Sequence, residues 1–149
     1  KKKDENVKLC YHYIDLACGK KTFHIFQKHK DQVIRIDPEH SFWPDSEMGL
    51  PKFPFKYVII KKEEIIANAY VRRNSEIYND KLWAMGVGVK PEYRKRGFGT
   101  AVVSAATKEV VNKNGGIALW STEVNNVGSL KIAEKLGYQK YKAYIRISK

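Results

Sequence analysis

The sequence lacks most of the features that set specialised protein classes apart. It has no apolar run of about 18 residues, so we expect no membrane-spanning helix. Its two cysteines, Cys10 and Cys18, have neither CxxC spacing nor a neighbouring histidine cluster. We therefore expect reduced thiols in a cytoplasmic protein, with a disulfide or redox pair as the alternative. The four histidines, at positions 12, 24, 29 and 40, show no metal-ligand spacing, and no metal is expected.

The chain also lacks internal repeats and low-complexity linkers. Its N-terminal stretch "KKKDENVKLC" has cations but no apolar segment behind them, so it is not predicted to be a secretory signal. The 149 residues, of which 43% are hydrophobic and 12% aromatic, are enough to bury a core. We therefore expect a single domain over residues 1–149.

Positive charge is in excess and is distributed unevenly. The formal charge of +12 comes from 28 Lys and Arg against 16 Asp and Glu. Residues 1–89 hold 16 cations and 12 anions, a net charge of +4, whereas residues 90–149 hold 12 cations and 4 anions, a net charge of +8. A polyanionic partner, either a nucleic acid or a multiply phosphorylated small molecule, would therefore meet the C-terminal part. Plain solubility is the alternative explanation.

Residues 1–54 carry weak secondary-structure patterns. "VKLCYHYIDL" (7–16) fits a strand or a short helix, and "KTFHIFQKHK" (21–30) is weakly helical. "DPEHSFWPDSEMGLPKFP" (37–54) is rich in proline and predicts a long loop. Loops of that length in compact domains often serve as lids or binding loops.

From residue 55 the patterns are clear. They predict strands at 55–61, 65–73 and 81–89, a helix at 98–113, a strand at 117–122, a helix at 127–136 and a last strand or strands at 138–147. This order indicates an α/β layer structure. In the third strand, Gly86 and Gly88 lie on the face opposite Val87 and Val89. Glycine in a strand marks a bulge, close packing of a neighbour or the approach of a ligand.

The stretch "YRKRGFGT" (93–100) joins the third strand to the first long helix. Helix N-termini have unpaired N–H groups and a positive dipole end, and glycines there let an anion approach. The stretch therefore predicts a phosphate site. It is neither a Walker loop nor a dinucleotide fingerprint, because GxxxxGK[ST] and the third glycine of GxGxxG are both missing.

Two motifs together carry a resemblance to a known family. "VGVKPEYRKRGFGTAVVSAAT" (87–107) resembles the acetyl-CoA-binding motif of the GCN5-related N-acetyltransferases. "NNVGSLKIAEKLGYQKY" (125–141) is similar to the family's C-terminal segment. The resemblance covers residues 55–149 and leaves 1–54 as a divergent N-terminal part. It implies a mixed, mostly antiparallel sheet flanked by helices and splayed at the acetyl-CoA site.

The resemblance also implies which residues bind coenzyme A. The backbone of Val87 and Val89 would pair with the pantetheine arm, and Gly86 and Gly88 would leave room for it. The remaining cofactor contacts would come from the loop after the third strand and from the start of the second helix: Arg94, Lys95, Arg96, Gly97, Phe98, Gly99, Thr100, Asn126 and Ser129. The basic C-terminal part would then match the phosphates of coenzyme A.

The chemistry implied is direct attack of an amine on a thioester, which needs a base and often an acid. Glu123 is our candidate base, with Glu76 or a water-mediated route as alternatives. The family's usual acid is a tyrosine at the position of Ala133. The loss of that tyrosine leaves Tyr138 as our candidate acid, with Tyr141, Tyr144 or unassisted departure of the thiolate as alternatives.

The leading hypothesis is an acetyl-CoA-dependent N-acetyltransferase that uses no metal. Its acceptor would be a primary amine of a small molecule or peptide. The alternatives are an acyltransferase with a longer acyl group, a non-catalytic CoA-binding or regulatory module, and a nucleic-acid-binding domain. A nucleic acid is not the expected partner, because no RNP, KH or helix-turn-helix pattern is present. No membrane association is expected, and a homodimer is left open.

Overall fold

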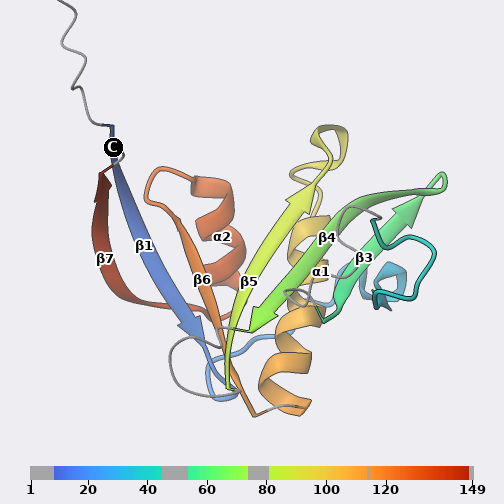
Figure 1. Cartoon of the computed structure of the whole chain (residues 1–149), viewed down its shortest axis with the longest axis horizontal. Coiled ribbons are helices and arrows are strands. Elements are labelled where there is room, and N and C mark those ends of the chain that lie inside the picture. Colours follow the sequence, from blue (N-terminus) through green and yellow to red (C-terminus); the bar gives the residue numbers. More distant parts are fainter. Residues whose placement is uncertain (1–8, 45–53, 74–80, 114, 148–149) are drawn as a thin grey trace, which may run out of the picture.

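One mixed sheet organises the chain, whose described residues in the computed structural model are 9–44, 54–73, 81–113 and 115–147. Within them the sheet has seven strands in the order β2-β3-β4-β5-β6-β1-β7 (Figure 1). Every neighbouring pair is antiparallel except β5 and β6, which run parallel. The expected fold, a mostly antiparallel sheet flanked by helices, is confirmed.

The strands are β1 (Cys10–Cys18), β2 (Ile34–Ile36), β3 (Lys56–Lys61), β4 (Glu64–Arg73), β5 (Leu82–Val89), β6 (Ile117–Glu123) and β7 (Gln139–Ile147). The helices are α1 (Phe98–Lys108), which continues into the π-helical turn η4 (Glu109–Lys113), and α2 (Val127–Lys135). Two short 3-10 turns are η1 (Lys30–Gln32) and η3 (Pro91–Tyr93). No helix among these is long and apolar enough to cross a bilayer.

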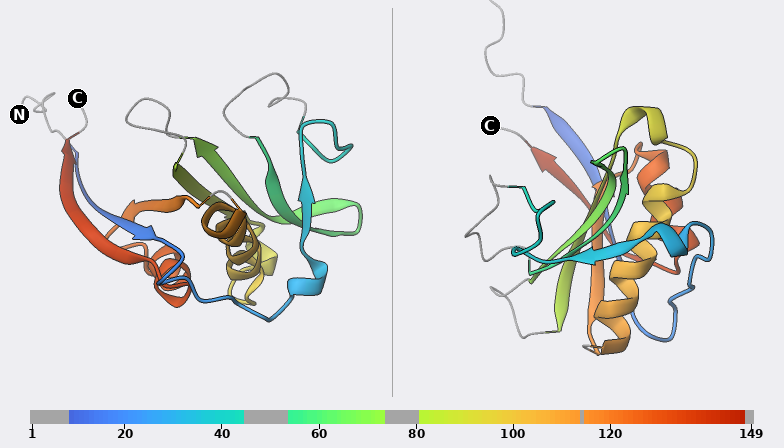
Figure 2. Two further views of the ribbon diagram at one scale, coloured as in Figure 1. Left: turned by 90° about the horizontal axis from the view of Figure 1, so that it is seen from below. Right: turned by 90° about the vertical axis from the view of Figure 1, so that its right-hand side faces the viewer.

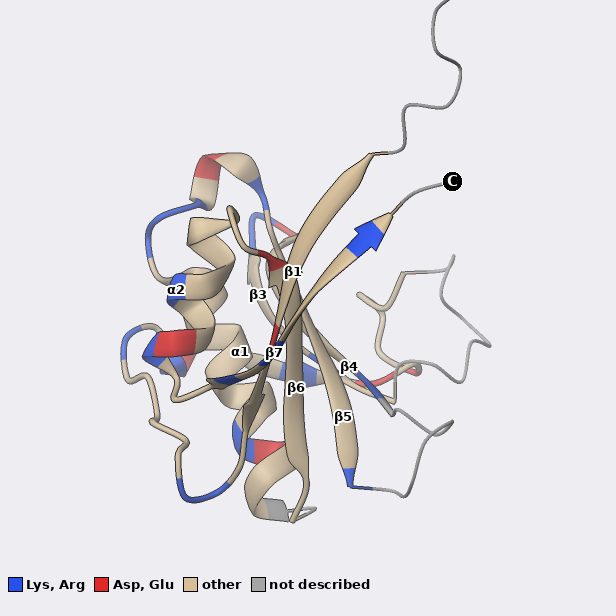
Figure 3. Ribbon diagram, turned by 90° about the vertical axis from the view of Figure 1, so that its left-hand side faces the viewer, with Lys and Arg blue, Asp and Glu red and all other residues tan. Residues whose placement is uncertain are grey.

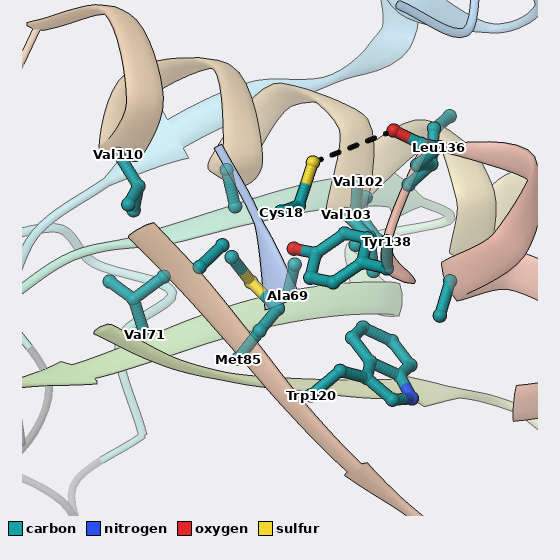
Figure 4. Packing of buried hydrophobic residues seen from close by; sticks show 14 of the residues in the cluster. Cys18, Ala69, Val71, Met85, Val102, Val103, Val110, Trp120, Leu136 and Tyr138 are labelled. Carbon is teal, nitrogen blue, oxygen red and sulfur yellow. Dashed lines mark hydrogen bonds between the residues drawn. The ribbon is translucent and has the colours of Figure 1, made fainter. Parts of the chain in front are cut away.

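Both helices cover one face of the sheet, and we call the opposite side the open face (Figure 2). Alternation along the strands explains the division. Trp83 and Met85 of β5 point into the main core, together with Val102 and Val103 of α1. Figure 4 shows part of this cluster, which also includes Trp120 of β6.

A second, smaller cluster lies on the open face at the other end of the sheet. It consists of Ile36, Trp43 and Val58, which are nearly inaccessible to solvent. The ammonium group of Lys56 lies 5.0 Å from the centre of the Trp43 ring. Trp43 belongs to the predicted long loop, and residues 37–44 contain no helix or strand, as expected. Residues 45–53 of that loop lie outside the described residues.

Of the two readings for the stretch 7–16, the strand is the one observed: from Cys10 onward it belongs to β1, which pairs with β6 and β7. One expectation for the first 54 residues needs correction. The stretch 21–30 is not helical, because its backbone bonds run to distant segments. The N–H of His24 donates to the Leu136 carbonyl, and the N–H of Phe26 donates to the Ser104 hydroxyl. The short edge strand β2 was not predicted at all.

A buried carboxylate ties this edge of the sheet to the end of α1. Glu109 is almost fully buried and accepts from Arg35 Nε at 2.7 Å and from the Tyr57 hydroxyl at 2.9 Å. Burial, and next the bond to Glu109, raise the pKa of Tyr57 to about 12. The three residues come from β2, β3 and η4, so the network fixes how the sheet packs on the helix.

The turn after α2 has no room for a side chain. Gly137 has φ +91°, and a Cβ there would lie 1.8 Å from the Thr22 carbonyl oxygen. We expect Gly137→Ala to lower the free energy of unfolding by at least about 2 kcal/mol, measured by urea denaturation. Gly128→Ala on α2, with nothing within 4 Å, should leave it unchanged or raise it by up to about 1 kcal/mol. Equal effects of the two changes would contradict the packing.

Candidate functional site

The central feature of the site is the divergence of β5 and β6. Their parallel pairing covers only Leu82 to Ala84 on β5, opposite Ile117 to Leu119 on β6. Beyond that point β5 stays paired with β4 and β6 stays paired with β1, and the two strands separate in a V (Figure 1). We call the edge of β5 from residue 85 to 89 and the facing edge of β6 from residue 120 to 123 the splay.

The backbone of β5 presents free hydrogen-bonding groups to the splay. The N–H of Lys90 donates to the carbonyl of Ile66, directly opposite on β4. Because these bonds alternate along an antiparallel ladder, Val87 and Val89 direct their backbone groups away from β4, into the splay. The Val89 carbonyl indeed accepts a bond at 3.2 Å from Arg94 Nε instead of from a strand. An extended ligand could add to this edge as a strand does.

The start of α1 adjoins the end of β5. Gly97 has φ +87° and caps the helix, and the first helical bond runs from the Ala101 N–H to the Gly97 carbonyl. In the described part of the chain, the N–H groups of residues 97–100 have no backbone acceptor. Four unpaired donors at a positive helix end are an arrangement that can bind an anion.

Three exposed cations precede these donors. Arg94, Lys95 and Arg96 lie on the surface, and Lys95 has the left-handed φ of 61°. We call residues 94–100 the phosphate loop. The guanidinium of Arg96 lies 5.3 Å from the ring centre of Phe98, which is itself buried. Most of the Lys and Arg segments visible in Figure 3 lie on the helix side of the sheet, where this loop also lies.

The start of α2 lies beside the splay and is held by its own cap. The Asn126 side-chain oxygen accepts from the N–H of Ser129 at 3.2 Å, and within the described residues its amide nitrogen makes no hydrogen bond. The Ser129 hydroxyl accepts from the indole N–H of Trp120 at 2.9 Å. Both predicted residues are therefore structural parts of the splay wall.

Glu123 ends β6 and points to the open face. Its cross-strand neighbour is Tyr13, its backbone carbonyl accepts from the Asn126 N–H, and its carboxylate has no partner within the described residues. The Tyr144 ring stacks on Tyr13 at 5.6 Å, and its hydroxyl lies 3.2 Å from that of Ser121 on β6. A carboxylate and a hydroxyl pair thus lie together beside the splay. The alternative base Glu76 lies outside the described residues.

Tyr138, the expected acid, is instead a core residue. It is 3% exposed, and its hydroxyl is bonded at 2.7 Å to Thr107, which is fully buried. Burial raises its pKa far above the usual range. Figure 4 shows its ring between Cys18 and Trp120, within the main cluster. A tyrosine so placed cannot deliver a proton to a ligand in the splay. The sequence feature that could have indicated the burial of Tyr138 is its position directly after the tight turn at Gly137.

Of the reasons considered for the strand glycines, close packing of a neighbour is the one observed. A Cβ on Gly86 would lie 2.2 Å from the Tyr70 ring, and one on Gly88 would lie 3.1 Å from the Asn68 amide nitrogen. Their missing side chains make room for these neighbours on β4. Gly99, on the helix side, lets α1 approach Val89, whose side chain would be 3.0 Å from a Cβ there.

No metal site accompanies these groups. Among the described residues, no three His, Cys, Asp or Glu side chains come close enough to hold an ion. The two cysteines are free, Cys10 on the surface and Cys18 in the core. Burial raises the pKa of the Cys18 thiol, so it is no nucleophile at neutral pH.

Comparison with known proteins places this arrangement in context. The family model described as "GNAT acetyltransferase" matches residues 17–147. No curated protein matches the sequence. A solved structure assigned to the GNAT family, from Novosphingobium aromaticivorans, superposes with a TM-score of 0.69 at 13% identity, over 92% of this chain and 63% of that one. A GCN5-related N-acetyltransferase-like protein from Streptococcus suis gives 0.64 at 19% identity, over 94% and 61%.

An aminoglycoside acetyltransferase from a soil metagenomic sample, solved with sisomicin, superposes over 73% of this chain and 90% of its own length. Its TM-score is 0.54, at 14% sequence identity. The chain thus spans about three fifths of the first two structures and most of the third. At these identities the likeness concerns the fold.

Two tyrosines that are close in sequence should respond differently to loss of the hydroxyl. Tyr138→Phe leaves the buried Thr107 hydroxyl without its partner and should lower the free energy of unfolding by about 1–2 kcal/mol in urea titrations. Tyr144→Phe, on the open face, should change it by no more than about 0.5 kcal/mol. A cost for Tyr144→Phe equal to that of Tyr138→Phe would contradict this assignment.

Proposed function

Because the chain belongs to the GNAT acetyltransferase family, we propose that it is an N-acetyltransferase that uses acetyl-CoA and a primary amine acceptor. The observation that carries the proposal is the splay, which opens directly beside the unpaired donors of the phosphate loop. A ligand with an extended arm and a pyrophosphate fits both parts at once. We assign the whole of residues 1–149 to this one domain and place it in the cytoplasm.

The proposed cofactor contacts use hydrogen-bonding groups that face the splay or lie at the start of a helix. The backbone of Val87 and Val89 would pair with the pantetheine arm, as a neighbouring strand would. The amides of residues 97–100 would hold the pyrophosphate, and Arg94, Lys95 and Arg96 would neutralise it. The exposed Asn126, at the start of α2, would donate from its amide nitrogen to the arm, with Ser129 one turn further along the helix.

The acceptor would arrive from the open face. On the helix side, α1 closes the approach, because Gly99 lies against Val87 and Val89. The open face beside β6 presents Glu123, Ser121 and Tyr144. An amine there is attracted by the Glu123 carboxylate. The acceptor class we propose is a small molecule or peptide amine, in line with the aminoglycoside acetyltransferase among the structural relatives.

Acetyl-CoA would supply the acetyl group as a thioester when bound, and the residues of this chain would then only transfer protons. Glu123 would take the proton of the attacking amine, directly or through water. The Tyr144 hydroxyl, through Ser121, would return a proton to the departing thiolate in place of Tyr138. Direct transfer in a ternary complex needs no cysteine nucleophile, and Cys18 is buried in the core.

A non-catalytic CoA-binding module is the second candidate, favoured by one observation. Ala133 stands where the family's acid tyrosine is expected and is completely buried in the main core. No larger side chain fits there without repacking. The two candidates agree on cofactor binding and differ on turnover.

Cofactor binding is tested by charge reversal at exposed positions. Lys95→Glu with Arg96→Glu should weaken acetyl-CoA binding by about 100-fold in isothermal titration, because two cations then become anions beside the pyrophosphate. Lys20→Glu with Lys21→Glu makes the same charge change at exposed positions in the turn after β1 and should cost less than about threefold. Absence of binding by the unmodified protein would refute the proposal.

Turnover is tested by thiol release from acetyl-CoA with a panel of amines, aminoglycosides and peptides. Glu123→Gln should lower kcat by about 100-fold or more with the best acceptor, while acetyl-CoA affinity is retained. Glu134→Gln, on the exposed side of α2, is the matched control and should leave kcat unchanged. Tight acetyl-CoA binding with no thiol release for any amine would favour the non-catalytic module.

A further inference from the structure

A histidine from the N-terminal third lies under the phosphate loop. His29 Nε2 is 2.9 Å from the backbone carbonyl oxygen of Arg96. Its ring lies 4.3 Å from that of Phe98, and its Cδ2 is 3.6 Å from where a Gly97 Cβ would be. Among the described residues it therefore touches three successive positions of the loop, across 67 residues of sequence.

A second hydrogen bond determines which nitrogen of the neutral His29 ring carries the proton. Gln32 Nε2 lies 3.0 Å from His29 Nδ1, and an amide nitrogen is a donor, so Nδ1 accepts. The proton of the neutral ring is then on Nε2, which donates to the Arg96 carbonyl. His29 itself has φ 65°, an uncommon conformation that the Gln32 N–H stabilises by bonding to the His29 carbonyl at 2.9 Å.

This donation fixes the direction of the next amide. The peptide between Arg96 and Gly97 is trans, so its carbonyl and its N–H point in opposite directions. With the Arg96 oxygen held toward His29, the Gly97 N–H points away from it, as the first donor of the helix end. The bond also directs the Arg96 carbonyl dipole away from the region where the pyrophosphate would bind.

We propose that His29 is a positioning residue for the pyrophosphate of coenzyme A, acting through the Arg96–Gly97 peptide. The inference rests on the proposed function. It adds to the cofactor site a residue from the N-terminal part of the chain, outside both sequence motifs. It also gives the irregular stretch 23–33 a role, because Phe26 packs beside His29 against Gly97, with its Cζ 3.4 Å from the Cβ position. The side chain does not touch the cofactor in this account.

Two variants separate the donor from the packing. His29→Phe keeps an aromatic ring against Phe98 but cannot donate, and His29→Gln restores an N–H without the ring. Coenzyme A and S-acetylpantetheine, which lacks the pyrophosphate, are titrated calorimetrically into each variant. His24→Phe, at an exposed position nearby, is the matched control. Thermal melts verify that each variant is folded.

We expect His29→Phe to bind coenzyme A about tenfold more weakly and S-acetylpantetheine with unchanged affinity. His29→Gln should recover coenzyme A binding to within about threefold, and His24→Phe should equal the unmodified protein. Unchanged coenzyme A affinity in His29→Phe would overturn the inference about His29 and leave the proposed function intact. So would an equal loss for both ligands, which would make His29 a general support of the fold. If the unmodified protein binds neither ligand, the proposed function fails with it.

Discussion

The short parallel pairing between β5 and β6 is the constraint on which the rest of the molecule depends. Three residue pairs hold the two strands together, and beyond Ala84 each strand follows a different neighbour. β5 continues along β4 to Val89, and β6 continues along β1 to Glu123. A continuous sheet would have used the backbone groups of Val87 and Val89 that face the splay for pairing between strands. Their availability to a ligand is thus a consequence of strand pairing elsewhere in the sheet.

The two sides of the splay are held apart by packing on the helix face. Trp120 of β6 donates to Ser129 at the start of α2, and its ring meets Tyr138 edge-on at 5.6 Å. On the other side, Gly99 brings α1 close against Val87 and Val89. Each strand is therefore fixed to its own helix. The same contact that fixes β5 also brings the N-terminus of α1 to the end of the splay, where the phosphate loop begins.

Sequence patterns predicted the elements from residue 55 onward because those elements are made by local signals. Alternation marks β3 to β5, and glycine and asparagine caps mark the two helices. The N-terminal part resisted prediction because its structure comes from distant partners. β1 pairs with β6 and β7, more than 100 residues later, and the stretch 21–30 is bonded to α1 and to the end of α2. No local pattern encodes such contacts.

At the candidate site the same distinction holds. The start of α1 at the phosphate loop was predicted, because its glycines and cations are consecutive in sequence, while phosphate binding there stays a prediction. Tyr138 was wrongly taken as a candidate acid, since burial by Thr107 and Cys18 depends on three separate segments meeting. The pair of Tyr144 and Ser121 was missed as a unit, because its hydroxyls meet only across β1. His29 was given no role for the same reason, since its contacts with residues 96–98 cross 67 residues of sequence.

The burial of Ala133 and Tyr138 bears on where a proton can come from. Both residues close the helix side of the splay with apolar packing, and the Tyr138 hydroxyl is already bonded to Thr107. A proton donor for a thiolate in the splay therefore has to come from the open face or from water. The Tyr144 and Ser121 hydroxyls lie on that face, beside the candidate base Glu123. Under the proposed function, both proton transfers would occur on the side from which the acceptor would arrive, while the helix side would only hold the cofactor.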